Sequence, residues 1–497
     1  MTDLPQLLTS HPAALLLAPV SVALLIGPRG ARAPWRTAVD GPLLVGLGLA
    51  VALVCEVWLV GFLLPGGSTA SDFGEYCEGI AELRGIPNSL PAHNRSRATA
   101  WVVAQLSRPL GVIGGLHAAA ALGLGLTAAC VGLCARVLHS RLAAVAAALS
   151  VGALVPLVLL SRTFSYYPLV TAGFAMAAAG ACLLGRSAHP LAYAAAGVGA
   201  GLALLADLRG LIFALPVVGL GLLGLLRRPW PLAPVRALAL ALPLLWSHGV
   251  GPWAYPRRHA VSLEGQADLP NFALILEHPH QTALQLRSAD SAFLWGTSDL
   301  RELPLTLAYL RRFSALGPGS AGRQALHDDG YRSRVKPWLV PTGGALLIAL
   351  FALHRQPWAA LGLLAALAPW AANLRGAVQT QASEWRFLAV GAPGVAVLFG
   401  LAYAALATAW ARGPTRGAGA TGRLLLAAAP LPAILLGALP SPLGPVSPWK
   451  QVRLNGSSQV EKHLEGEDPR WPGCAAAIAE DRARGLIPPK RSRVGGP

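Results

Sequence analysis

Two carboxylates three residues apart open an acidic segment that follows a long apolar block. If this segment is helical, Asp72 and Glu75 share one face, because residues three apart are neighbours on a helix surface. A carboxylate held at a membrane surface is suited to act as a general base toward an attacking hydroxyl. The same pair also fits a helix cap, with Asp72 as N-cap and Glu75 at the third position. Taken alone, the local sequence favours the cap.

Several arginines are suited to bind a phosphate, because a guanidinium group binds two phosphate oxygens at once. Asp207 and Arg209 lie between two apolar blocks, where charged residues are costly and usually functional; a mutual salt bridge at a helix turn is the alternative. Arg257 and Arg258 directly follow another apolar block and fit either a lipid phosphate or an ordinary solvated loop. Any one of these arginines also fits an anchor at the membrane interface.

Metal-ligating and cysteine patterns carry less information. Glu277, His278 and His280 have no standard zinc spacing, so no cofactor is assigned, and a divalent metal stays open. Cys77 and Cys474 are the only cysteines outside the apolar blocks. In an oxidising compartment they would form a disulfide that ties the C-terminal segment to the acidic segment, and chance placement is the alternative.

Long apolar blocks must position all of these residues. The chain has 497 residues, of which 54% are apolar and 13% charged, against roughly 25% charged in soluble domains. Blocks of about 18 apolar residues or more predict membrane-spanning helices, because only a helix satisfies its own backbone in lipid. The composition excludes a soluble globular domain and predicts an all-α polytopic integral membrane protein with about twelve transmembrane helices. The predicted spans are 12–27, 43–64, 112–135, 142–160, 166–185, 189–206, 209–226, 231–248, 337–354, 357–373, 386–411 and 422–440. The pair around Asp207 is alternatively one broken helix.

The distribution of arginine between successive loops predicts the orientation. One alternate set of short loops has many arginines and a single acid, Asp40, and is therefore predicted to be cytoplasmic. Its arginines are Arg29, Arg32, Arg36, Arg136, Arg141, Arg186, Arg227, Arg228, Arg236, Arg355, Arg412, Arg416 and Arg423. This topology accounts for the formal charge of +17, and the absence of a basic stripe with interleaved aromatics argues against nucleic-acid binding.

The opposite set of loops holds nearly all the acidic residues and is predicted to lie outside. It includes a first outer loop at 65–111, a large outer loop at 249–336 and a polar tail. Loops of this length are more often functional than idle. We therefore divide the chain into a transmembrane domain, 1–440, and an extracytoplasmic C-terminal tail, 441–497.

The first outer loop contains the candidate carboxylates in a segment with helical periodicity, 71–87. Its apolar residues form one stripe, and its acidic residues, Glu78 among them, line the other side. The stripe consists of Phe73, Tyr76, Cys77, Ile80 and Leu83. This pattern predicts a short amphipathic helix that lies along the outer membrane surface.

This layout resembles the GT-C glycosyltransferases, among them the protein O-mannosyltransferases, the aminoarabinose transferases of lipid A and the polyprenyl-phosphate-dependent mannosyltransferases. The similarity covers about 43–411 in layout: a span, an outer loop that opens with Asp72 and continues to Tyr76, and then many spans with short outer loops. The turn at Asp207 is similar to the family's paired mid-chain helices, and Glu384-Trp385-Arg386 to its outer arginine before a terminal span. The chain departs from the O-mannosyltransferases in lacking their adjacent Asp-Glu pair.

The resemblance implies a mannosyltransferase-like enzyme of the cell envelope that moves a sugar from a polyprenyl-phosphate donor to an acceptor on the outer face. It implies Asp72 as general base with Glu75 as a second acid. It also implies supporting roles and a set of donor-phosphate ligands. The ligands are Arg209, Arg257, Arg258 and Arg386, and the supporting residues are Tyr76, Glu78, Asp207 and Glu384. The implied partners are the donor, a lipid, glycan or protein acceptor, and the bilayer of the cytoplasmic (inner) membrane, with the active face extracytoplasmic.

Other functions stay open at this point. A transporter or flippase usually places polar groups near the membrane midplane, on broken helices in symmetric halves, whereas here they gather at the outer ends. A polysaccharide polymerase or ligase for lipid-linked glycans also uses a large outer loop with arginines, but the early acidic loop argues for the transferase. A scaffold of GT-C shape without activity is the remaining alternative.

Overall fold

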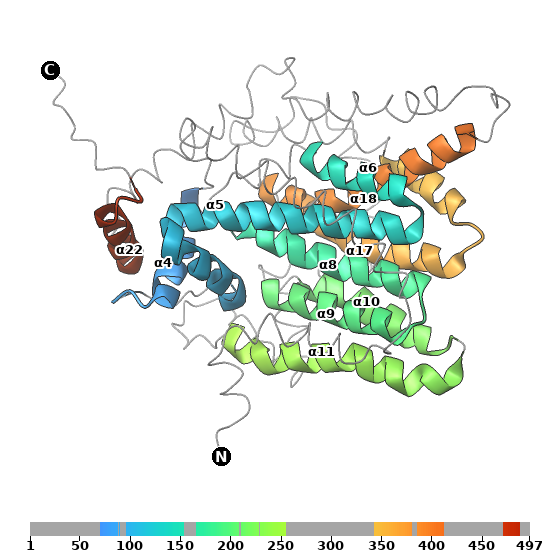
Figure 1. Ribbon diagram of the computed structural model, residues 1–497, viewed down its shortest axis with the longest axis horizontal. Coiled ribbons are helices and arrows are strands. Elements are labelled where there is room, and N and C mark those ends of the chain that lie inside the picture. The colour runs from blue at the N-terminus through green and yellow to red at the C-terminus, as the bar shows by residue number, and fades with distance from the viewer. Residues whose placement is uncertain are drawn as a thin grey trace.

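The computed structural model describes residues 70–87, 89, 96–153, 166–207, 210–227, 229–254, 342–379, 385–411 and 471–487. All regular elements in these ranges are helices, arranged as an up-and-down bundle with two short helices across one end (Figure 1). The bundle helices are α5 (Arg97–Leu138), α6 (Arg141–Ala153), α8 (Tyr167–Arg186), α9 (Pro190–Ala206), α10 (Gly210–Leu225), α11 (Ala233–Ala254), an unlabelled helix Thr342–Ala352, α17 (Pro357–Gln379) and α18 (Trp385–Ala411). A 3-10 turn, η1 (Trp230–Leu232), precedes α11, and the two short helices are α4 (Ala70–Arg84) and α22 (Pro472–Ala483).

The chain is an integral membrane protein by the length and composition of its helices. Four helices in the described ranges are long and apolar enough to cross a membrane: Arg97–Leu138, Tyr167–Arg186, Trp230–Gly251 and Ala392–Ala409. Shorter apolar helices occupy the predicted spans 189–206, 209–226, 337–354 and 357–373. The predicted spans 12–27, 43–64 and 422–440 lie outside the described residues, so the total of about twelve stays a prediction.

The helices approach closely where small residues meet. A Cβ atom on Gly180 of α8 would lie 2.7 Å from Cα of Ala196 on α9. A Cβ atom on Gly185 would lie 2.6 Å from the carbonyl oxygen of Trp358 on α17. Small side chains let the backbones approach in this way, which is how helices pack in membranes without a hydrophobic force between them.

The longest helix, α5, is two helices joined at a kink. Pro109 lies within it, and Gly111 has φ 74° and ψ 170°, a conformation open almost only to glycine. The second part begins at Val112, the first residue of the predicted span 112–135. The first part therefore belongs to the predicted outer loop, and the kink marks the point where the chain turns into the bundle.

Replacing Gly111 with alanine should destabilise the protein by about 1–3 kcal/mol, because alanine is strained in this conformation. The added Cβ would also lie 3.0 Å from a carboxylate oxygen of Asp481. Denaturant unfolding in detergent, followed by circular dichroism, measures the change. Gly249→Ala is the matched control, since nothing lies within 4 Å of a Cβ at that helical position. If Gly111→Ala and Gly249→Ala have the same free energy of unfolding, the backbone conformation of Gly111 does not require glycine.

The two ends of the bundle differ in charge. Among the described residues, every Asp and Glu belongs to α4, to α22 or to the residue that ends α9. We call this end, formed by α4, α22, the first part of α5 and the C-terminal ends of α9 and α11, the acidic end. The connections α5–α6, α8–α9 and α10–α11 lie at the opposite end (Figure 1). That end carries the described arginines Arg136, Arg141, Arg186, Arg227, Arg236 and Arg355.

Candidate functional site

The candidate site is built on α4, whose end is defined by the sequence. The helix stops at Gly85, which has φ 83°. The N–H of Gly85 bonds to the carbonyl of Glu82 and that of Ile86 to the carbonyl of Ala81, each at 3.0 Å. This pair of bonds is the Schellman motif, which satisfies the last helical carbonyls and requires a residue that tolerates positive φ.

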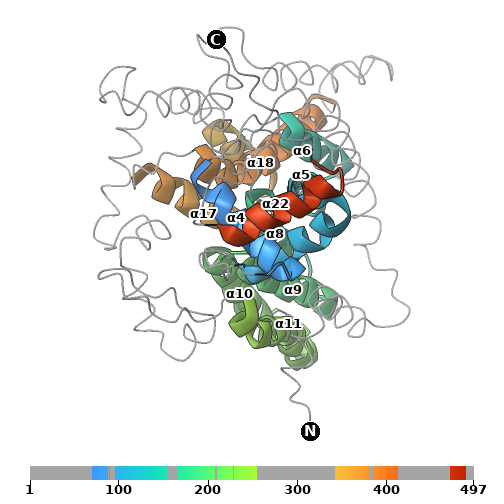
Figure 2. The ribbon, with the colours of Figure 1, turned by 90° about the vertical axis from the view of Figure 1, so that its left-hand side faces the viewer.

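The predicted amphipathic helix therefore exists, but it does not lie free along a surface. Its apolar stripe is buried, with Phe73, Cys77 and Ile80 at 0% exposure. Its acidic side is covered too, because Glu75 is 9% and Glu78 only 1% exposed. The expectation of a surface helix was wrong because the tail helix α22 packs across α4 at the end of the bundle (Figure 2).

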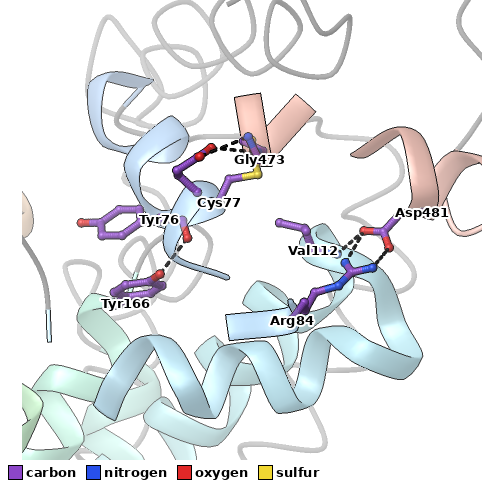
Figure 3. The surroundings of a disulfide bond; sticks show 9 residues. Tyr76, Cys77, Arg84, Val112, Tyr166, Gly473 and Asp481 are labelled. Carbon is purple, nitrogen blue, oxygen red and sulfur yellow. Dashed lines mark hydrogen bonds and ion pairs between the residues drawn. A yellow bond between two sulfur atoms is a disulfide. The ribbon is translucent and has the colours of Figure 1, made fainter. Parts of the chain in front are cut away.

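A disulfide and a helix cap join α22 to α4 (Figure 3). The sulfur atoms of Cys77 and Cys474 are 2.07 Å apart, and both side chains are buried. The carboxylate of Glu78 accepts hydrogen bonds from the backbone N–H of Gly473 at 3.1 Å and of Cys474 at 2.7 Å. These N–H groups belong to the first turn of α22, where the helix dipole favours a negative charge. Glu78 thus holds the tail helix in place.

A second contact lies two turns further along both helices. Arg84 donates a hydrogen bond from Nη1 to Oδ2 of Asp481 at 3.1 Å, and its Nη2 forms an ion pair with Oδ1 at 2.9 Å. It also pairs with Glu480 at 2.9 Å. Burial alone would lower the pKa of Arg84, but Asp481 and then Glu480 raise it above the ordinary value. The disulfide and the Arg84–Asp481 pair both join residues 397 apart, so the two helices meet at two points that are seven residues apart on each.

Asp481 also caps the second part of α5. Its Oδ2 accepts a hydrogen bond from the backbone N–H of Val112 at 2.6 Å, and its side chain is 0% exposed. Val112 is the first residue after the kink, so this N–H has no partner within its own helix. One buried carboxylate from the tail therefore joins the acidic helix to the start of a membrane span (Figure 3).

Breaking the disulfide should weaken the attachment of the tail. Cys474→Ser removes a cross-link that closes a chain of 397 residues, and loss of a native disulfide typically costs about 2–5 kcal/mol. We expect faster proteolysis of the tail and a lower unfolding midpoint in the variant. A thiol reductant should lower the stability of the wild-type protein and leave the variant unchanged. If the reductant lowers the stability of both proteins equally, loss of the disulfide does not explain its effect.

α4 also contacts the residue that precedes α8. Tyr166, the residue before α8, donates its hydroxyl to the carbonyl of Tyr76 at 2.7 Å. The centroids of the two rings are 4.4 Å apart. Asp72 stands three residues before Glu75 and four before Tyr76, so its position is a neighbour of both on the helix surface. Asp72 is the third residue of α4, inside the helix and not before it, and its side chain is outside the described part of the structure.

Asp207 lies at the same end of the bundle. It ends α9, and its carbonyl accepts the N–H of Gly210 at 2.8 Å, so 189–206 and 209–226 form two helices joined by a tight turn. The start of α5 docks on this turn, because Ser96 donates its hydroxyl to the carbonyl of Leu205 and Thr99 to that of Ala206, the latter at 2.8 Å. The acidic helix and the mid-chain turn therefore meet through α5.

The remaining predicted residues are not tested by the geometry. Arg209, Arg257, Arg258 and Glu384 lie outside the described residues, and Arg386 is described only as the second residue of α18. Within 70–87, 96–153 and the other described ranges, no three His, Cys, Asp or Glu side chains form a group that would hold a metal ion. A divalent metal thus stays an open expectation.

Sequence reasoning missed several residues that build this end. Glu82 and Arg97 form an ion pair at 2.6 Å, and the guanidinium of Arg97 lies 5.9 Å from the ring centre of Trp253 on α11. Arg84, Asp481 and Tyr166 were also missed as structural residues. In the sequence, each of these residues is only a charge or a tyrosine in a predicted outer segment. Such a residue type does not identify a contact partner that is far away in the sequence.

The comparison with solved structures identifies the fold. The structure is similar to the crystal structure of the Archaeoglobus fulgidus oligosaccharyltransferase in the apo form, with a TM-score of 0.51 and 13% sequence identity. The match covers 94% of this chain and 61% of that chain, so this chain spans about three fifths of the length of its match. The similarity concerns the fold. No protein-family model and no curated protein matches the sequence.

The match to an oligosaccharyltransferase agrees with the resemblance found in the sequence, at the level of architecture. At 13% identity the similarity concerns the arrangement of helices and not the chemistry of individual residues. The sugar, the acceptor and the site residues must therefore be argued from this chain alone.

Proposed function

We propose that the protein is a glycosyltransferase that moves a sugar from a polyprenyl-phosphate donor to an acceptor on the non-cytoplasmic face of the membrane. The observation that carries this proposal is the acidic end of a GT-C-type bundle, where a buried acidic helix is held between α8 and the tail. A fold alone does not define an activity, but this end gathers titratable residues where a lipid head group would lie.

The orientation follows from the charges of the two ends. Arginine accumulates at the cytoplasmic ends of membrane helices, and all the described acids lie at the other end. The Cys77–Cys474 disulfide supports the same assignment, because disulfides persist in oxidising compartments outside the cytoplasm. The acidic end is therefore extracytoplasmic in this proposal.

In the reaction, the hydroxyl oxygen of the acceptor attacks the anomeric carbon of the sugar while the bond from that carbon to the phosphate oxygen breaks. Asp72 takes the hydroxyl proton, and Glu75 is the second acid beside it. Polyprenyl phosphate leaves with a developing negative charge, which Arg209, Arg257, Arg258 and Arg386 are proposed to stabilise. Tyr76, Asp207 and Glu384 support the site, whereas Glu78 acts through the tail helix.

The direct test uses the full-length protein in liposomes that contain radiolabelled polyprenyl-phosphate sugars and extracted envelope acceptors. Formation of a new glycosylated product supports the proposal. Movement of the labelled donor across the bilayer without product would support a flippase, and joining of preassembled glycans would support a polymerase or ligase. The structurally similar protein is by name an oligosaccharyltransferase, so donors with one sugar and with several sugars should both be supplied.

A further inference from the structure

Three arginines gather at the end of the bundle opposite to α4, and we call Arg186, Arg227 and Arg236 the arginine cluster. Arg227 follows α10 and donates Nη1 to the carbonyl of Leu184 in the last turn of α8, at 2.7 Å. Arg236, in the first turns of α11, donates Nη1 to the carbonyl of Arg227 at 2.6 Å. Arg186 ends α8 and donates Nη1 to the side chain of Gln356.

No described carboxylate neutralises this cluster, because every described Asp and Glu belongs to the acidic end. Arg236 is only 1% exposed, and its Nε–H has no acceptor among the described residues. Burial lowers the pKa of Arg227, and the neighbouring charge of Arg236 contributes to the same shift. A buried guanidinium is normally paired with an anion, since removing a charge from water is costly.

Helix capping accounts for only part of this arrangement. The carbonyls of Leu184 and Arg227 lie at the C-terminal ends of α8 and α10, where the helix dipole is negative. Each carbonyl accepts one N–H and carries a fraction of a charge, whereas the cluster has three full positive charges. Snorkelling toward water explains the exposed Arg186 but not Arg236, which is buried among the helices.

The surroundings of Arg227 combine aromatic and apolar surface. Its guanidinium lies 4.6 Å from the ring centre of Trp358, and that of Arg236 lies 6.0 Å from the ring centre of Tyr193. Leu226 and Trp230, on either side of Arg227 in the chain, are 61% and 56% exposed. Amphipathic aromatics and exposed apolar side chains beside arginine are typical of the level at which lipid head groups meet acyl chains.

We propose that the arginine cluster binds a phosphate anion, supplied by the head group of an anionic membrane lipid or by free phosphate. The planar fork of arginine suits two phosphate oxygens, and Arg186 is exposed while Arg227 is half-buried. Arg236 lies behind Arg227 and adds its charge while it holds the Arg227 backbone. This site is at the opposite end from the proposed catalytic helix and does not depend on the proposed glycosyl transfer.

The test measures binding to the delipidated full-length protein in detergent by native mass spectrometry and by thermal shift. The probes are dioctanoyl phosphatidylglycerol, dioctanoyl phosphatidylcholine and inorganic phosphate. The variants are Arg227→Gln and Arg186→Gln, and Arg355→Gln is the matched control because Arg355 is exposed at the same end and bonds to its neighbour His354.

We expect phosphatidylglycerol to bind at least tenfold more tightly than phosphatidylcholine. We expect Arg227→Gln and Arg186→Gln each to weaken this binding about fivefold or more, and Arg355→Gln to change it less than twofold. Competition by inorganic phosphate at equal concentration would assign the site to free phosphate, and its absence to the lipid. Equal binding of both lipids without phosphate binding, or equal losses in all three variants, would overturn the proposal. Arg186→Gln keeps the test valid if Arg227→Gln fails to fold, since Arg186 is exposed.

Discussion

Membranes that contain Asp72→Asn should transfer about 10²- to 10⁴-fold less sugar than membranes with the wild-type protein, the usual contribution of a general base. Asparagine has nearly the same shape and helix propensity as aspartate, so α4 should still form. What it loses is the ability to take a proton from the acceptor hydroxyl. Initial rates with a radiolabelled polyprenyl-phosphate sugar measure the effect, with the amount of folded protein compared by gel filtration.

The matched control is Glu480→Gln, another acid-to-amide change at the acidic end. Glu480 is 45% exposed, and its partner Arg84 keeps the buried Asp481, so this variant should retain at least half of the wild-type rate. A purely structural role for Asp72 in the first turn of α4 predicts a different pattern, in which Asp72→Asn keeps its activity and Asp72→Ala loses stability. That pattern, with transfer intact, would remove Asp72 as the base and return it to the structural interpretation.

Asp481→Ala should be the most destabilising single change in the tail. It leaves the guanidinium of Arg84, which is 3% exposed, without its buried carboxylate, although Glu480 still pairs with it. It also removes the acceptor for the N–H of Val112. Breaking a buried ion pair by removing one partner typically costs about 3–5 kcal/mol, because the other charge stays buried. Unfolding in mixed micelles with increasing SDS measures the change in free energy.

The double variant Arg84→Met, Asp481→Ala separates the two contributions. If the unpaired charge dominates, the double variant should recover part of the loss, since no buried guanidinium remains. If the cap on Val112 dominates, both variants should be equally unstable. A change of less than about 0.5 kcal/mol in Asp481→Ala, the size usual for surface substitutions, would contradict the burial and contacts described for this carboxylate. The disulfide is present in all these variants, so the tail stays attached while its packing is measured.

The sequence predicted the local features of this protein well. Spans such as 166–185 and 231–248 coincide with α8 and with the helix that begins at η1, because the hydropathy of a short segment decides whether it is stable in lipid. The periodicity of 71–87 predicted α4, which the structure ends at Arg84. The alternation of arginine between loops likewise predicted two ends of different charge.

The candidate site was predicted only in outline. The sequence brought Asp72, Glu75 and Tyr76 together, because residues three or four apart share a helix face. It offered a disulfide between Cys77 and Cys474 as one of two alternatives, and the structure joins these two residues. The sequence did not predict that the acidic side of α4 is covered. The helix that covers it, α22, lies about 400 residues later in the chain, whereas helix spacing relates only residues three or four apart.

Helical class, membrane insertion and the distribution of charge were determined by the sequence itself, since each depends on residues within one turn or one span of each other. The tertiary structure alone decided that Glu78 caps the tail helix and that Asp481 joins Arg84 to Val112. It also decided that Arg236 is buried with none of the described acids beside it. These contacts depend on how distant helices pack, and packing is a property of the assembled shape that no local pattern of hydropathy or charge records.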